Sequence, residues 1–174
     1  MSLQPPPYTT FPPFYTLQSN LQTRARQLEL WTSWILMYCA HHRVYKLSLA
    51  SPPSELFGNS KIKRGLKPSD CVTVLEHMAK VEGRVEWLDK TKRFCYVHWK
   101  LPDEWADVIL KWIEDTGQKG SVLTVYELRE SDAVRNMEWR DMDEDLLKKV
   151  LGVLVKKGKA QIFGQQDGLG VKFF

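Results

Sequence analysis

The side chains that most often carry catalysis are few and scattered in this sequence. None of the histidines has the HExxH spacing or the matching cysteine pair of a metal site; they are His41, His42, His77 and His98. The chain also lacks the GxSxG turn of a serine hydrolase and the glycine-rich GKS or GKT loop that cradles phosphate. We therefore expect no enzyme activity, no metal site and no cofactor.

Acidic side chains gather in one place, close to residue 140. Asp143 stands where a helix should begin, and a carboxylate there caps free backbone N–H groups and suits the helix dipole. That structural interpretation is the simpler one. The functional interpretation is an acidic docking surface for a basic partner, formed by Glu138, Asp141, Glu144 and Asp145.

The most informative binding motif is Pro-Pro-x-Tyr, which occurs twice near the N-terminus. The copies are Pro5, Pro6, Pro7 and Tyr8, and then Pro12, Pro13, Phe14 and Tyr15. Proline fixes φ, so an extended polyproline segment loses little entropy on binding, and a nearby tyrosine can fill an apolar pocket. Two copies predict two contact segments on one folded body. The motif also suits WW domains, and a disordered tail whose prolines only limit aggregation is a further interpretation.

The elements behind this tail follow from apolar spacing and capping residues. Asn20 can cap a helix over about 20–43, VYKLSLA alternates like a strand, and a short helix follows near 54–58. A basic connector then leads to a helix that begins at Pro68 and ends at Gly83. A hairpin over 84–99 completes this half.

The same order then begins again. A helix opens at Pro102, SVLT reads as a strand and VYELRE as a short helix, and a charged loop over 129–142 precedes the helix that Asp143 caps. The final hairpin turns at Asp167-Gly168. At an offset of 75 residues Cys71 corresponds to Leu146 and Leu75 to Val150, which indicates a diverged repeat.

Helix, strand, helix, helix and hairpin is the order of a winged helix. We therefore predict an α+β fold of two tandem winged-helix domains preceded by an extended proline-rich tail. The predicted domains are the tail over 1–18, winged helix 1 over 19–100 and winged helix 2 over 101–174.

Charge argues against the use of these winged helices on DNA. The net charge is +4, with 14 Lys and Arg against 7 Asp and Glu in residues 1–100, and 11 against 14 in residues 101–174. A recognition helix needs basic neighbours for phosphate, but the two candidates begin PSDCVTVLEHM and MDEDLLKK. Direct nucleic-acid binding therefore remains an alternative that the charges disfavour.

The remaining composition indicates the cytosol. The sequence shows no secretory signal and no stretch near the roughly 20 apolar residues of a membrane span. The cysteines are odd in number and far apart, which favours reduced thiols; they are Cys39, Cys71 and Cys95.

These residues together carry a resemblance that covers essentially the whole chain. PPPYTTFPPFYTLQSNLQTRARQLELW, the tandem winged helices, WKLPDEWADVILKWIEDTGQ, TVYEL and the ending GVKFF resemble the family of vacuolar protein sorting-associated protein 25, the small subunit of the ESCRT-II complex. The loop over 129–142 is not mapped onto that family.

The resemblance implies a non-catalytic adaptor in the endosomal sorting of ubiquitinated membrane cargo into multivesicular bodies. The two Pro-Pro-x-Tyr segments would bind the two larger winged-helix ESCRT-II subunits, with two copies of this chain in each complex. Winged helix 2 would recruit the myristoylated ESCRT-III subunit. Ubiquitin and lipid binding would belong to other subunits, so this cytoplasmic chain would reach the endosomal membrane indirectly.

Overall fold

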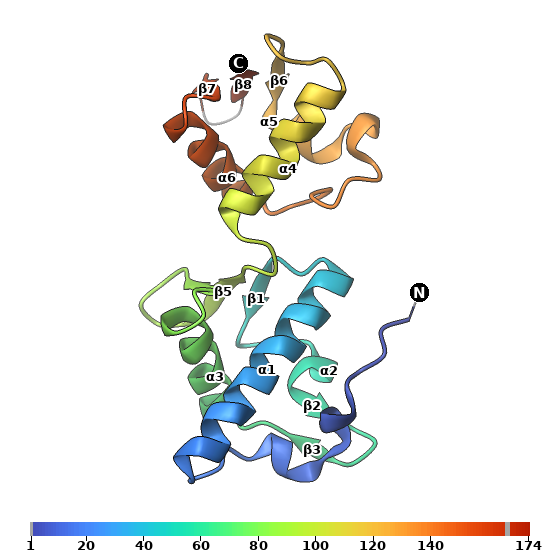
Figure 1. Ribbon diagram of the computed structural model, residues 1–174, viewed down its shortest axis with the longest axis vertical. Helices are drawn as coiled ribbons and strands as arrows, with labels where there is room; N and C mark the ends of the chain where they lie inside the picture. Colours follow the sequence, from blue (N-terminus) through green and yellow to red (C-terminus); the bar gives the residue numbers. More distant parts are fainter. Residues whose placement is uncertain (1, 166–167) are drawn as a thin grey trace. The chain divides into compact units, whose positions relative to one another are not determined.

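The computed structural model of the chain describes residues 2–165 and 168–174 (Figure 1). The chain divides into two compact units, of which the first ends at Trp99 and the second begins at Lys100, and each is described by itself. Asp167, which the sequence places at the last hairpin turn, lies outside the described residues.

The proline-rich tail belongs to the first unit and is not extended throughout. Residues 2–6 are extended, and two short 3-10 helices follow, η1 (Pro7–Thr10) and η2 (Pro12–Tyr15). The backbone N–H of Thr9 donates to Pro6 at 3.0 Å, and that of Phe14 donates to Phe11 at 3.0 Å. Because proline holds φ near the value that 3-10 turns need, these turns add local hydrogen bonds at little backbone cost.

Local signals set the bounds of the next helix. Helix α1 (Leu21–His42) begins after Asn20, whose side chain accepts the backbone N–H of Thr23 at 3.0 Å. It ends at Arg43, which adopts a left-handed φ of 53°. Strand β1 (Lys46–Ser48) and helix α2 (Ser54–Phe57) follow.

The basic connector contains a small hairpin that its sequence did not predict. Strands β2 (Gly58–Asn59) and β3 (Arg64–Gly65) pair antiparallel. A Cβ on Gly58 would lie 3.2 Å from the carbonyl oxygen of Ser54 and 3.3 Å from that of Arg64, so a glycine suits the close approach.

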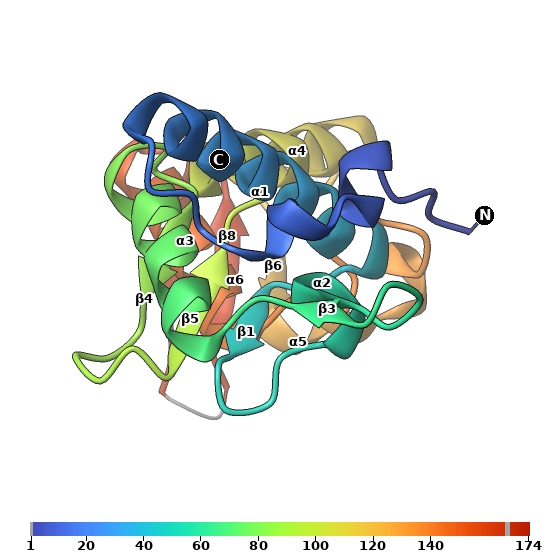
Figure 2. The ribbon, with the colours of Figure 1, turned by 90° about the horizontal axis from the view of Figure 1, so that it is seen from below.

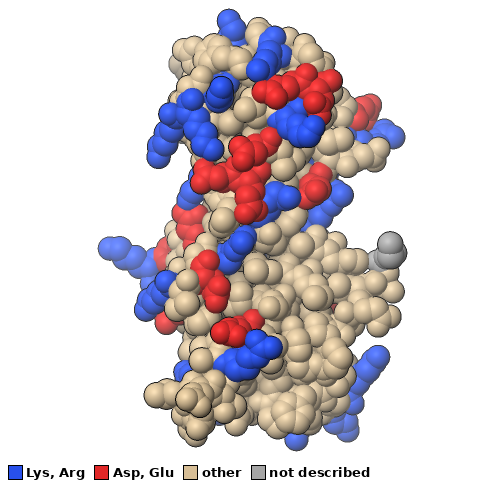
Figure 3. Space-filling view, viewed as in Figure 1, with Lys and Arg blue, Asp and Glu red and all other residues tan. Residues whose placement is uncertain are grey.

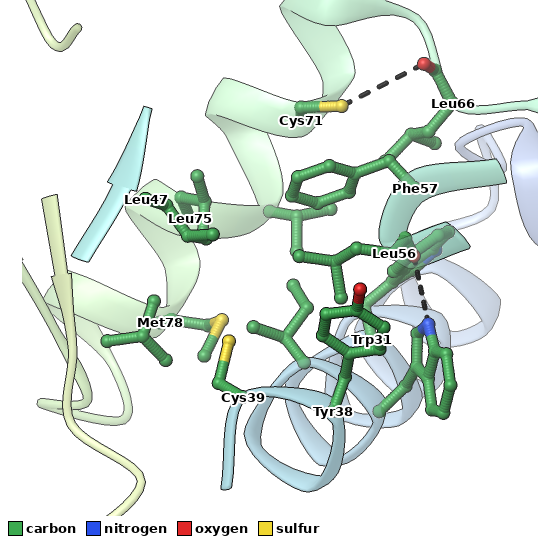
Figure 4. Packing of buried hydrophobic residues seen from close by; sticks show 14 of the residues in the cluster. Trp31, Tyr38, Cys39, Leu47, Leu56, Phe57, Leu66, Cys71, Leu75 and Met78 are labelled. Carbon is green, nitrogen blue, oxygen red and sulfur yellow. Dashed lines mark hydrogen bonds between the residues drawn. The ribbon is translucent and has the colours of Figure 1, made fainter. Parts of the chain in front are cut away.

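Helix α3 (Pro68–Lys80) and the hairpin of β4 (Val85–Trp87) and β5 (Phe94–Val97) complete the first unit, in which the sheet order is β1-β5-β4. Figure 4 shows apolar side chains from the helices gathered in one buried cluster. Fully buried side chains from α1, α2, α3 and the sheet form the core; they include Trp31, Leu47, Leu56, Leu75 and Met78.

The second unit repeats this plan. Helix α4 (Pro102–Asp115) is followed by β6 (Val122–Thr124), α5 (Val125–Glu130), η3 (Asp132–Val134), α6 (Glu144–Lys156), β7 (Ala160–Phe163) and β8 (Gly170–Phe173). Its sheet order is β6-β8-β7, which matches β1-β5-β4 strand for strand. The prediction of an α+β fold with two tandem winged helices is confirmed.

The segment 129–142 is more than the charged loop that its sequence suggested. Val134, Trp139 and Met142 are buried, and the Trp139 indole N–H donates to the Leu128 carbonyl at 2.9 Å. Arg129 donates through Nε to the Met142 carbonyl at 2.8 Å. The segment is therefore charged on its outside, while its buried side chains, Val134, Trp139 and Met142, complete the core of the second unit.

No helix within residues 2–165 and 168–174 is long and apolar enough to span a membrane.

Candidate protein-binding site

The second Pro-Pro-x-Tyr motif turns its aromatic pair into the body of the first unit. Phe14 stacks on Trp31 with ring centroids 4.2 Å apart and planes 9° apart, and Tyr15 meets the same indole edge-on at 5.6 Å. Both aromatic side chains are only 4% exposed. These two predicted contact residues are therefore part of the core.

Hydrogen bonds from α1 fasten the backbone behind these rings. Trp31 donates its indole N–H to the Phe14 carbonyl at 3.0 Å. The Gln27 amide nitrogen faces the carbonyl oxygens of Phe14 at 3.1 Å and Thr16 at 2.8 Å. Figure 2 shows the tail lying beside α1. The tail is thus bonded to the folded body and does not hang free of it.

The carbonyl of Thr9 joins the two motifs. It accepts the hydroxyl of Tyr15 at 2.9 Å and the side-chain amide of Asn59 at 2.9 Å. Burial raises the pKa of Tyr15, and it also raises the pKa of Tyr8 despite the opposing charge of Arg26. Both phenols therefore remain neutral donors through the physiological range.

The outer face of the tail is apolar and exposed. Pro5, Pro7, Pro12 and Pro13 are exposed, as is Phe11 at 60%. Pro6 and Tyr8 are half-buried, and the Tyr8 ring meets Phe14 edge-on at 5.1 Å. The structure therefore divides the predicted residues into an inner layer that packs against α1 and an outer layer that a partner can reach.

A groove of about 630 Å³ lies beside this face. The tail, the C-terminal half of α1, helix α2 and the start of the β2–β3 hairpin line it, with Leu3, Pro5, Trp34, Tyr38, Glu55 and Asn59 among the lining residues. In Figure 3 the neighbouring surface of the first unit carries few charged side chains. Depletion of charge together with exposed aromatic side chains is typical of the centre of a protein interface.

The four predicted acidic residues lie on the segment that leads into α6 and on its first turn. Glu138 pairs with Lys100 at 3.5 Å, Asp141 with Arg140 at 3.5 Å and Glu144 with Lys148 at 3.5 Å. Asp145 is exposed and has no ion pair with any residue that the structure describes. Partial neutralisation within the unit therefore leaves Asp145 as the most available charge.

Sequence reasoning missed further candidates. Helix α4 exposes five carboxylates, and Figure 3 shows acidic side chains gathered over it; they are Asp103, Glu104, Asp107, Glu114 and Asp115. Gln27 and Asn59 were also missed as residues that hold the tail. For Gln27 a signal existed, because it lies one helical turn before Trp31 on the buried stripe of α1.

Within the described residues the structure shows no group of three or more His, Cys, Asp or Glu side chains that could hold a metal ion. All three cysteines are buried free thiols. Burial raises the pKa of Cys71 to about 11 and that of Cys95 to about 12, which leaves both protonated and unreactive at neutral pH.

Two winged helices that present an apolar tail and acidic surfaces define a class of protein-binding adaptors. The family model of the ESCRT-II complex subunit matches residues 8–143. Vacuolar protein-sorting-associated protein 25 of Danio rerio is 41% identical over 175 residues, covering 100% of both chains. A crystal structure of subunit VPS25 of the endosomal trafficking complex ESCRT-II superposes with a TM-score of 0.87 at 31% identity, covering 97% of this chain and 98% of that one.

The same fold is found in a crystal structure of the endosomal complex ESCRT-II (VPS22/VPS25/VPS36), with a TM-score of 0.83, 31% identity and coverage of 97% and 98%. The chain belongs to the ESCRT-II complex subunit family, and its role lies in endosomal protein sorting.

Proposed function

We propose that this chain is a non-catalytic ESCRT-II subunit that helps to sort ubiquitinated membrane cargo into multivesicular bodies. The tail over 1–18 and winged helix 1 over 19–100 bind the larger ESCRT-II subunits. Winged helix 2 over 101–174 recruits the ESCRT-III nucleating subunit. The chain acts in the cytoplasm, and other subunits bring it to the endosomal membrane.

One observation carries the first part of this proposal. The tail presents Phe11 and its exposed prolines on a segment that the body already holds in one conformation. Preorganisation of this kind lowers the entropy lost on binding. A related complex contains VPS22 and VPS36 beside VPS25. In the proposed assembly each of the two larger subunits binds one copy of this chain.

The second part rests on the charge of winged helix 2. Residues 101–174 hold 11 Lys and Arg against 14 Asp and Glu, and the start of α6 exposes Glu144 and Asp145. A basic, myristoylated ESCRT-III partner would be steered toward such a surface. Complementary charge mainly raises the association rate and weakens with salt.

The buried tyrosine also bears on the WW-domain alternative. A WW domain binds its ligand as an exposed polyproline helix with the tyrosine accessible. Here Tyr15 is 4% exposed and its motif forms a 3-10 turn, so binding would first require removing an aromatic pair from the core. Nucleic-acid binding is disfavoured by Asp70 in the first turn of α3 and by Glu144 and Asp145 in that of α6.

Copurification of the intact chain with the two larger subunits tests the proposal. A chain with Phe11→Ser, Pro12→Ala and Pro13→Ala changes only exposed side chains, so we expect it to fold normally and to lose the complex on size-exclusion chromatography. Ser19→Ala, another exposed change near the same segment, is the control. Undiminished assembly of the triple variant would overturn the role of the tail.

A further inference from the structure

Two buried polar side chains of the first unit lie where the tail meets the body. Thr9 and Gln27 are only 4% and 6% exposed. A buried amide destabilises a fold unless its hydrogen bonds are made, so its presence demands an account. Gln27 occupies a position on α1 where an apolar side chain would pack without this requirement.

The amide of Gln27 meets backbone groups of the tail with both of its ends. Its Oε1 accepts the backbone N–H of Gln18 at 3.0 Å. Its Nε2 faces the carbonyl oxygens of Pro13 at 3.3 Å, Phe14 at 3.1 Å and Thr16 at 2.8 Å. The reverse orientation of the amide would set its oxygen against these carbonyls, so one orientation alone satisfies the site.

Trp31, one helical turn further on, adds its indole N–H to the Phe14 carbonyl. The segment from Pro13 to Gln18 belongs to no strand, and these two side chains supply the partners that a neighbouring strand would give. A fully bonded buried network favours one arrangement over its competitors. Side chains of α1 therefore fix the orientation of η2.

We infer that Gln27 is a positioning residue of the partner-binding site. It does not touch the partner; it holds Pro13–Gln18 so that Phe11, Pro12 and Pro13 face outward together. This inference rests on the proposed function, because it assigns a role in presenting the same surface.

The main test is Gln27→Met in the full-length chain. Methionine keeps the volume and helix preference but removes the amide that faces the tail carbonyls, and it leaves the Gln18 N–H without its acceptor. The Phe14 carbonyl keeps its bond from Trp31, and the Thr16 carbonyl keeps its bond from the Gln18 side chain. We expect affinity for the purified larger subunits, measured by calorimetry, to fall by about tenfold or more. Hydrogen exchange should show lost protection at the Gln18 amide, with the amides of α6 unchanged. Gln22→Met, exposed on the same helix, should leave both measurements unaltered.

A second variant separates positioning from general damage to the fold. Gln27→Glu at pH 7 places a carboxylate against three carbonyl oxygens, which should weaken binding further. Protonation of that buried glutamate restores one donor and retains the acceptor for Gln18, so binding should recover partly as the pH falls toward 5. Gln27→Met should show no such recovery, and a flat profile for both variants would overturn the inference.

The outcomes for the function and for the inference differ. If the Phe11, Pro12 and Pro13 triple variant loses binding while Gln27→Met stays within about twofold despite lost protection, the function stands and the inference fails. If neither variant weakens binding, the proposed function itself fails. Gln27→Met can also be added to the triple variant. If it weakens the residual binding there by the same factor as in the wild-type chain, Gln27 does not act through the tail, and the inference is wrong.

Discussion

Three aromatic rings, those of Phe14, Tyr15 and Trp31, pack together and join the tail to helix α1. Phe14 and Tyr15 come from the proline-rich tail, and Trp31 lies in the middle of α1. Aromatic pairs in such stacked and edge-on arrangements contribute roughly 0.5–1.5 kcal/mol beyond the area they bury. The tail is therefore held by core packing as well as by hydrogen bonds.

The buried thiols predict how stability depends on pH. A cysteine in an unfolded chain ionises near pH ~8.5. Burial raises the folded pKa of Cys71 to about 11 and of Cys95 to about 12, and it raises that of Cys39 as well. The folded state therefore binds more protons than the unfolded state above the unfolded pKa, so stability is full below that value and falls as the pH rises through the folded pKa values.

We expect each thiol to reduce the free energy of unfolding of the first unit by about 1.4 kcal/mol per pH unit in that window. Urea titrations between pH 8 and 10.5 measure this slope. Cys39→Ala should reduce this slope by the contribution of one thiol, about 1.4 kcal/mol per pH unit. A slope that is unchanged when all three cysteines are replaced would contradict the prediction.

At the scale of elements, local chemistry was sufficient for most boundaries. Asn20 and Asp143 both cap the helices that follow them, since capping depends on residues three positions away. The repeat offset also held, because α3 and α6 and the paired strands fall at corresponding positions.

The features that sequence missed depend on distant groups. The β2–β3 hairpin has two residues in each strand and relies on the close approach of Gly58 to the backbone of Arg64. Trp139 is buried because its indole finds the Leu128 carbonyl within a segment that is otherwise charged. The sequence predicts the tail motifs as contact segments, but the burial of Phe14 depends on Trp31, seventeen residues away along the chain.

The capping prediction can be measured directly. Asn20→Ala removes the acceptor for the Thr23 N–H, so we expect the free energy of unfolding of the first unit to fall by about 1 kcal/mol. Urea denaturation followed by tryptophan fluorescence reports this change. Ser19→Ala alters the preceding exposed residue and should leave the midpoint in place. Equal midpoints for the two variants would show that the cap contributes nothing.

At the scale of the whole chain, the two halves differ in the sign of their charge excess. Residues 1–100 have an excess of basic side chains and residues 101–174 an excess of acidic ones. The basic excess does not cover the tail, and the acidic excess includes both α4 and the start of α6. One half is therefore suited to an apolar contact and the other to electrostatic steering.

Neutralising the acidic start of α6 tests this division. Glu144→Gln with Asp145→Asn should slow association with a basic ESCRT-III N-terminal helix severalfold and flatten its dependence on salt, with little change in the dissociation rate. Stopped-flow kinetics at several ionic strengths would measure both effects. Glu29→Gln, an exposed acidic position in the first unit, is the control. Unchanged kinetics would assign the contact to the apolar residues of winged helix 2.

The packing of Phe14 and Tyr15 against Trp31 has a consequence for quality control. A binding segment that hung free would be available on every chain, including newly made or damaged ones. Here the segment is held against the folded body by side chains of α1 and β2, which are Gln27, Trp31 and Asn59. Assembly through this segment would then favour folded copies of the chain over misfolded ones.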